Sequence, residues 1–111
     1  MTVQEIIDQL ELEIVTAADC SREVTGGYTG DLLSNVMARA GTGNVWITIQ
    51  GHQNVAAVAL LTEVAAVIIA EGAPVAEQTV QRAREKGLNI LRSQQPAFEI
   101  AGQLYRLGVN N

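Results

Sequence analysis

Three short apolar segments from residue 45 onward constrain the fold more than any other feature. They are VWITI, AAVIIA and LNILRS, and each is followed by a stretch with helical character. A strand that is buried on both faces reads as a continuous apolar run of this kind. Strands that alternate with helices form parallel sheets with right-handed crossovers. We therefore predict an α/β fold whose strands at 45–49, 66–70 and 89–92 are parallel neighbours, with helices packed against the sheet.

The remaining elements extend this pattern over a single domain, residues 1–111. Residues 3–10 carry apolar side chains at the spacing of an amphipathic helix, and residues 12–16 read as a strand. The segment 17–31 is rich in Gly, Thr, Ser and Asp, so we expect a shaped loop with at most a short edge strand at 23–25. Further helical segments are expected at 32–40, where the pattern is helical or irregular, and at 54–64, 76–87 and 96–108.

Two of these helices have features that bear on packing. The helix at 54–64 starts with Asn54, a residue type that caps helix N-termini. This helix is apolar nearly all round, which requires that both of its flanks be covered. The closing helix carries four apolar residues along one side, namely Phe98, Ala101, Leu104 and Tyr105.

The low charge content predicts that part of the surface is covered by another subunit. Hydrophobic residues make up 48% of the chain and charged residues only 17%. A lone domain of this size, with an almost uncharged helix at 54–64, would expose a larger apolar patch than monomers usually do. We therefore expect a twofold homodimer with an interface above ~1,000 Å².

The charge pattern argues against a nucleic-acid surface. The formal net charge is -5, and residues 1–50 hold seven acids and two bases, whereas residues 51–111 hold five of each. Phosphate binding depends on clustered Lys and Arg, which are missing here. No apolar run reaches the ~20 residues of a membrane-spanning helix. The N-terminal residues lack the pattern of a secretory signal, so we expect a cytoplasmic protein with neither a nucleic-acid nor a membrane partner.

The stretch WITIQGHQNVAAVALLTEVAAVIIAEG, with the QRAREKG helix and LNILRS strand that follow it, resembles the DRTGG domain. In that family a strand leads into an Asp-Arg pair, then an alanine-rich helix, then a second strand that ends in a Thr-Gly-Gly-like turn. The family occurs beside other domains, as in HPr kinase/phosphorylase and CBS-containing pyrophosphatases, and as small free-standing proteins. Over residues 10–107 the chain resembles the free-standing members. The resemblance implies a DRTGG-like α/β domain with a regulatory role.

The chain departs from the family pattern at both of its named motifs. His52 and Gln53 stand where the family usually has Asp-Arg. Ala70, Glu71 and Gly72 correspond to the Thr-Gly-Gly turn. A charge-dependent role of the Asp-Arg pair is therefore not carried over to this chain.

The first candidate ligand site is the segment QGHQN after the strand at 45–49. Ligands of open parallel sheets bind outside the carboxyl ends of the strands, where helix N-termini present free amides. We expect His52 to be partly exposed there and to face the loop at 26–31. The structural alternative is that Gly51 makes the turn, Asn54 caps the helix and a buried His52 bonds to a neighbouring loop.

The second candidate is GGYTGD at 26–31, whose glycines allow positive φ and exposed amides, while Tyr28 offers a stacking surface. The alternative is a structural turn in which Asp31 caps the segment 32–40. We expect a ligand, if bound, to lie between the two segments and beside Gly72. The candidate ligand-binding residues are Gly26, Gly27, Tyr28, Thr29, Gly30, Asp31, Gly51, His52, Gln53, Asn54 and Gly72.

Catalytic motifs are missing from the chain. No segment has the Gly-Lys-Ser/Thr ending of a P-loop, so the kinase machinery of HPr kinase/phosphorylase is absent. One histidine with scattered acids, and Cys20 as the only cysteine, make neither a triad nor a metal site. We therefore predict no catalytic residue, metal or cofactor.

The function we expect is a non-catalytic regulatory or interaction module, homodimeric, with a small ligand or a protein as its partner. One alternative is a small hydrolase or transferase that uses His52 and Asp31. Another is a purely structural partner subunit.

Overall fold

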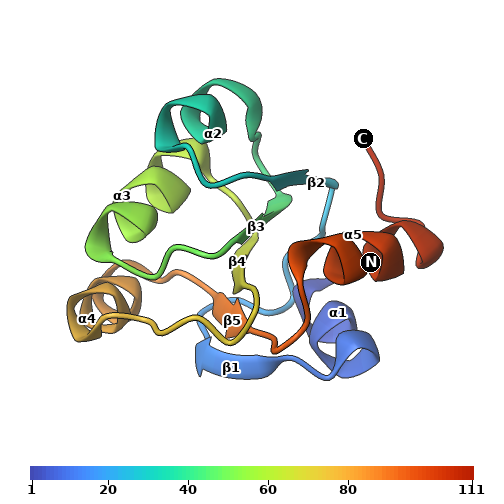
Figure 1. The fold of residues 1–111 in the computed structure, drawn as a ribbon, viewed down its shortest axis with the longest axis horizontal. Helices are drawn as coiled ribbons and strands as arrows, with labels where there is room; N and C mark the ends of the chain where they lie inside the picture. The colour runs from blue at the N-terminus through green and yellow to red at the C-terminus, as the bar shows by residue number, and fades with distance from the viewer.

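A single five-stranded sheet forms the centre of the computed structural model, which describes residues 1–111 (Figure 1). The strand order is β1-β5-β4-β3-β2. The strands are β1 (Glu13–Thr16), β2 (Gly26–Thr29), β3 (Asn44–Thr48), β4 (Ala66–Ile69) and β5 (Ile90–Arg92). The helices are α1 (Val3–Leu10), α2 (Leu33–Arg39), α3 (Gln53–Thr62), α4 (Glu77–Lys86) and α5 (Ala97–Arg106).

The predicted parallel core is confirmed. β3 pairs with β4 and β4 pairs with β5, both in parallel register, with Trp46 opposite Val67 and Val67 opposite Ile90. β2 adds a further parallel strand beside β3. β1 closes the other edge of the sheet in antiparallel register against β5.

Both faces of the sheet are covered by helices (Figure 1). On one face α1 and α5 pack over alternate strand residues such as Val45, Ile47 and Ile68. On the other face α2, α3 and α4 cover the intervening residues, among them Trp46 and Val67. Since the central strands point apolar side chains to both sides, neither layer of helices is dispensable.

The N-terminal helix is defined by its own sequence. Thr2 and Glu5 form a capping box, in which the Thr2 hydroxyl accepts from the Glu5 amide and the Glu5 carboxylate accepts from the Thr2 amide. Val3, Ile6 and Ile7 are buried against the sheet. The helix predicted at 3–10 is confirmed with these bounds.

The apolar helix α3 lies between α2 and α4, as expected from its composition (Figure 1). Val55, Ala56, Val58 and Ala59 are buried. Leu61 is its only large apolar side chain that is strongly exposed. The apolar character of this helix is therefore explained within one domain, and it offers little apolar surface for a second subunit.

The prediction of a loop over 17–31 is wrong at its end. GGYT forms β2, an edge strand in register with β3, with Gly27 opposite Val45 and Tyr28 opposite Trp46. The proposed edge strand at 23–25 is reduced to one bridge, between Glu23 and Thr2. Two glycines lower the strand propensity of this segment, so its pairing depends on the neighbouring strand.

None of the helices combines the length and the apolar composition that a membrane span requires.

Asn89 connects three parts of the chain at the start of β5. Its buried side-chain Nδ2 donates to the carbonyl oxygens of Asp19 and Ala65, both at 2.9 Å. Its Oδ1 accepts from the amide of Ala18 at 2.7 Å. One side chain thus pairs backbone groups of the loop after β1 and of the residue before β4.

Replacing Asn89 with Ala removes the buried bond to the Ala65 carbonyl oxygen and the part-buried bonds to Ala18 and Asp19. A buried polar group left unpaired costs about 1–3 kcal/mol, so we expect a loss of about 2–3 kcal/mol in the free energy of unfolding. Urea denaturation measures it. Asn35→Ala is the matched control, because Asn35 is exposed on α2, and it should change the free energy by less than about 0.5 kcal/mol. Equal effects of the two substitutions would contradict the role of Asn89.

Candidate functional site

The loops that follow the four parallel strands all leave the sheet at its carboxyl edge. This edge holds Gly30 and Asp31 after β2, Gly51 to Asn54 after β3, and Gly72 after β4. These are the positions where ligands of parallel sheets are found. The structure therefore places seven of the eleven predicted residues along one edge.

Asp31 connects the two predicted segments. Its Oδ1 accepts from the Thr48 hydroxyl at 2.8 Å and from the Ile49 amide at 3.0 Å. The side-chain amide of Gln50 also donates to the Asp31 carbonyl oxygen. Asp31 does not cap α2, whose N-cap is Leu32 with no side-chain hydrogen bond. The segments 26–31 and 50–54 are thus joined through Asp31 and Gln50.

Gly30 is positioned by the buried tryptophan of β3. Trp46 Nε1 donates to the Gly30 carbonyl oxygen at 2.9 Å. The expectation that the glycines of this segment adopt positive φ is wrong, because Gly26, Gly27 and Gly30 are all outside that region. The pairing of β2 with β3 keeps this backbone extended.

The backbone of Gly51 closely approaches another backbone segment of the same chain. A Cβ at this position would overlap the carbonyl group of Pro74. The Gly51 carbonyl oxygen accepts from the Ala76 amide at 2.9 Å and from the Thr79 hydroxyl at 2.8 Å. Gly51 therefore joins the β3–α3 loop to the start of α4.

His52 is exposed, as predicted, but its role differs from the predicted one. It is the N-cap of α3, and its Nδ1 accepts from the Asn54 amide at 3.2 Å. The expectation that Asn54 caps the helix is wrong, since α3 starts at Gln53. No hydrogen bond joins His52 to Asp31 or to the rest of the segment 26–31, so the structure lacks the pair that the enzyme alternative requires.

Gly72 lies in a left-handed turn after β4. Glu71 and Gly72 have φ values of 60° and 62°. The Glu71 amide donates to the Gln95 carbonyl oxygen at 2.9 Å, and the Gly72 amide donates to that of Ser93 at 2.8 Å. This turn connects the ends of β4 and β5, and the side chain of Gln94 fills the space beside Gly72.

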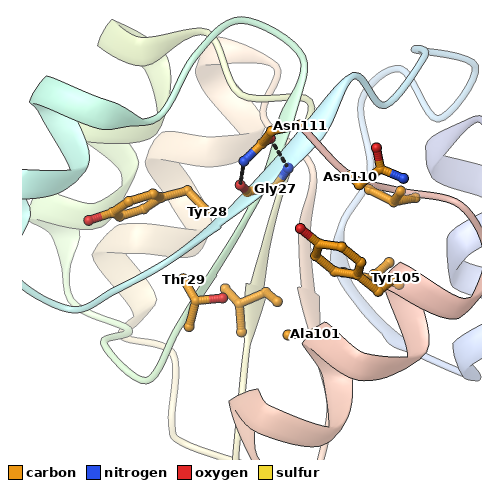
Figure 2. Close-up of a pocket in the computed structure, with 10 residues that line it drawn as sticks. Gly27, Tyr28, Thr29, Ala101, Tyr105, Asn110 and Asn111 are labelled. Carbon is orange, nitrogen blue, oxygen red and sulfur yellow. Dashed lines mark hydrogen bonds between the residues drawn. The ribbon is translucent and has the colours of Figure 1, made fainter.

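The other four predicted residues, Gly26 to Thr29, lie in β2, and three of them, Gly27, Tyr28 and Thr29, border a different hollow. It is a cavity of about 80 Å³ between β2 and α5. Asn111 closes one side, because its amide group pairs with both the amide and the carbonyl of Gly27, at 3.1 and 3.2 Å (Figure 2). The ring of Tyr28 points away from Tyr105 and packs on the other face of the sheet (Figure 2).

Sequence reasoning missed the C-terminal residues that line this hollow. They are Ala101, Leu104, Tyr105, Val109, Asn110 and Asn111. No motif marks them. The apolar spacing of 96–108 indicated a helix, but only the tertiary structure places it beside β2.

The carboxyl edge is acidic. Asp31 and Glu71 are both exposed there. Arg92, the last residue of β5, forms an ion pair with Glu13 at 3.2 Å and also donates to the Ala73 carbonyl oxygen. The edge thus has two carboxylates and no free Lys or Arg among its loops.

The thiol and the metal-ligating residues offer no reactive group. Burial raises the pKa of Cys20, and the Asp19 carboxylate raises it further. Hydrogen bonds from Ser21 lower the pKa of Asp19, which keeps that charge in place. A thiol with a raised pKa is a poor nucleophile near neutral pH. No three His, Cys, Asp or Glu side chains are grouped to hold a metal ion.

Comparison with known proteins identifies the class of this α/β domain. The DRTGG domain family matches residues 5–107, and the chain therefore belongs to the DRTGG family. No curated protein matches the sequence.

A solved structure shares the fold with a TM-score of 0.69 at 10% sequence identity. It contains the CBS and DRTGG domains of the regulatory region of a Clostridium perfringens pyrophosphatase, complexed with the activator diadenosine tetraphosphate. The match covers 93% of this chain and 45% of the pyrophosphatase chain, so the present chain spans less than half the length of that structure.

Gly51→Ala should be strongly destabilising, because the added methyl group overlaps the Pro74 backbone. Overpacking of this kind costs about 2–3 kcal/mol. Chemical denaturation checks it against Gly27→Ala, where the new Cβ would meet only the Val45 carbonyl oxygen at 3.5 Å. A Gly51→Ala protein as stable as the control would show that the loop can move away from Pro74.

His52→Ala should lower the free energy of unfolding by about 0.5–1 kcal/mol, because α3 loses its N-cap. This exceeds the loss expected of an ordinary exposed side chain. His52→Asn supplies another capping group and should keep the wild-type stability. If both variants unfold at the wild-type denaturant concentration, the hydrogen bond to Asn54 contributes nothing to stability.

Proposed function

We propose that this domain is a non-catalytic regulatory module that forms a homodimer and binds a small polar ligand at the carboxyl edge of its sheet. Membership of the DRTGG family supports the regulatory role, since the fold recurs in the regulatory region of a pyrophosphatase. The low charge content and several exposed apolar side chains support self-association.

The arrangement of the polar residues supports a non-catalytic role. The imidazole of His52 is engaged at Nδ1 by the helix it caps. The Asp31 carboxylate is held by Thr48 and Ile49. Neither side chain orients the other, and catalysis by a nucleophile and a base requires such a contact.

The observation that carries the ligand proposal is the series of contacts along the carboxyl edge. Asp31 bonds to the loop after β3, Gly51 bonds to the start of α4, and Gly72 bonds to the loop after β5. A ligand seated on this edge would touch loops from four strands at once. Binding there would change contacts on both helix layers, as a regulatory site requires.

The charge of the edge supports a particular ligand class. Asp31 and Glu71 are exposed carboxylates, and no unpaired Lys or Arg lies among the edge loops. A polyphosphate would then be held by backbone amides against two like charges. We therefore favour a neutral or cationic ligand rich in hydroxyl, amide or amine groups.

A thermal-shift panel of polyols, amides, amines and nucleotides, with diadenosine tetraphosphate included, tests this proposal. Neutral or cationic compounds should raise the melting temperature, and Asp31→Asn should reduce their affinity about tenfold or more by calorimetry. The matched control is Glu63→Gln, an exposed acid at the opposite edge of the sheet, which should bind normally.

Two results would contradict the ligand proposal. One is a panel in which only polyphosphates bind. The other is an equal loss of binding in Asp31→Asn and Glu63→Gln.

A further inference from the structure

The outward side of α5 carries the most exposed aromatic residue of the chain. Phe98 is 85% exposed and Tyr105, two turns later, is 68% exposed. The inward side of the same helix holds the buried residues Ile100 and Leu104. The four apolar residues expected along one side of this helix are therefore divided between the core and the surface, and the aromatic pair faces outward.

Gly102 lies between the two aromatic residues and has no role within the chain. It sits inside a helix, outside the positive-φ region, and a Cβ there would meet no atom within 4 Å. Glycine in a helix interior destabilises the helix relative to alanine. A hollow of about 350 Å³ lies over it, bordered by Phe98 and Tyr105. A glycine at such a place permits close approach of another backbone.

Two opposite charges flank this surface. Glu99 and Arg106 are both exposed on α5, and neither forms an ion pair within the chain. They lie near opposite ends of the helix. A second α5 that runs antiparallel across the first would therefore bring each Glu99 close to Arg106 of the other copy. The charge pattern is complementary to itself, which a twofold interface requires.

We propose that the outward side of α5, defined by Phe98, Glu99, Gly102, Tyr105 and Arg106, is the surface on which a second copy of this chain docks. The two α5 helices cross antiparallel about a twofold axis near Gly102, where they are closest. Phe98 of each copy then packs over the hollow of the other, beside Tyr105. This inference deepens the proposed function and rests on the homodimer in it.

The other exposed apolar side chains are less suited to this contact. Leu61 belongs to α3 and Met37 to α2. Both helices lie on the opposite side of the sheet from α5 (Figure 1). Neither lines the hollow beside Gly102. Leu61 is the only large exposed apolar residue of α3, and Met37 is accompanied on α2 only by the N-cap residue Leu32. A membrane surface would call for basic residues around the apolar face, whereas this one has one acid and one base.

The size of the outward side of α5 sets the expected affinity of the dimer. A ten-residue helix is about 15 Å long, so the contact lies at the small end of specific interfaces. We expect a dissociation constant in the micromolar range. Sedimentation equilibrium from about 1 to 500 µM covers this range.

Substitutions on α5 test the surface. Phe98→Glu should weaken the dimer by at least about tenfold, whereas the matched Leu61→Glu on α3 should leave it unchanged. Gly102→Leu should raise the melting temperature of the dilute monomer, because helix propensity improves, and yet weaken the dimer by at least about tenfold. A structural role for Gly102 alone would predict no effect on assembly.

A charge exchange tests the antiparallel arrangement. Glu99→Arg and Arg106→Glu should each weaken the dimer, because like charges then face each other. The double variant should regain most of the wild-type affinity, since each pair is restored in reverse.

Three outcomes separate this inference from the proposed function. A wild-type chain that stays monomeric at about 500 µM overturns both the homodimer and this surface. A dimer that persists in Phe98→Glu and Gly102→Leu overturns this surface and leaves the homodimer intact. A double charge variant no tighter than the single ones overturns the antiparallel arrangement. The ligand panel does not depend on any of these results.

Discussion

Burial of both faces of β3, β4 and β5 is the constraint on which the rest of the structure depends. These strands point apolar side chains to both sides, so a layer of helices must cover each face. The crossovers α2, α3 and α4 supply one layer, and the terminal helices α1 and α5 supply the other. Because parallel strands all run in one direction, the same constraint gathers their following loops at one edge.

The contacts at that edge explain how separate loops act together. Asp31 bonds to the loop after β3, and Gly72 bonds to the loop after β5. Gly51 bonds to the first turn of α4. Most of these bonds use backbone groups, which need close approach and not a particular side chain. The fold of a DRTGG domain is thus kept here with His52 and Gln53 at the positions where the resemblance places the family's Asp-Arg pair.

The edge and the outward side of α5 are physically connected. The Gln95 carbonyl oxygen accepts from the Glu71 amide, directly before Pro96, the N-cap of α5. A molecule bound beside Gly72 would thus contact the segment that sets where α5 begins. The turn after β4 therefore helps to fix where α5 begins.

The sequence by itself determined the fold class, the parallel central strands and the edge at which seven of the eleven candidate residues lie. Those features follow from the apolar runs and the order of strands and helices, which are local properties. Only the tertiary structure decided that GGYT is a strand, because two glycines carry little strand propensity and the pairing with β3 supplies the stability. It also decided that His52 caps α3, because the β3–α3 loop packs against Pro74 at Gly51 and this path sets the first helical residue. Likewise, the outward position of Phe98 and Tyr105 depends on which side of α5 the sheet buries, and helical spacing alone does not specify it.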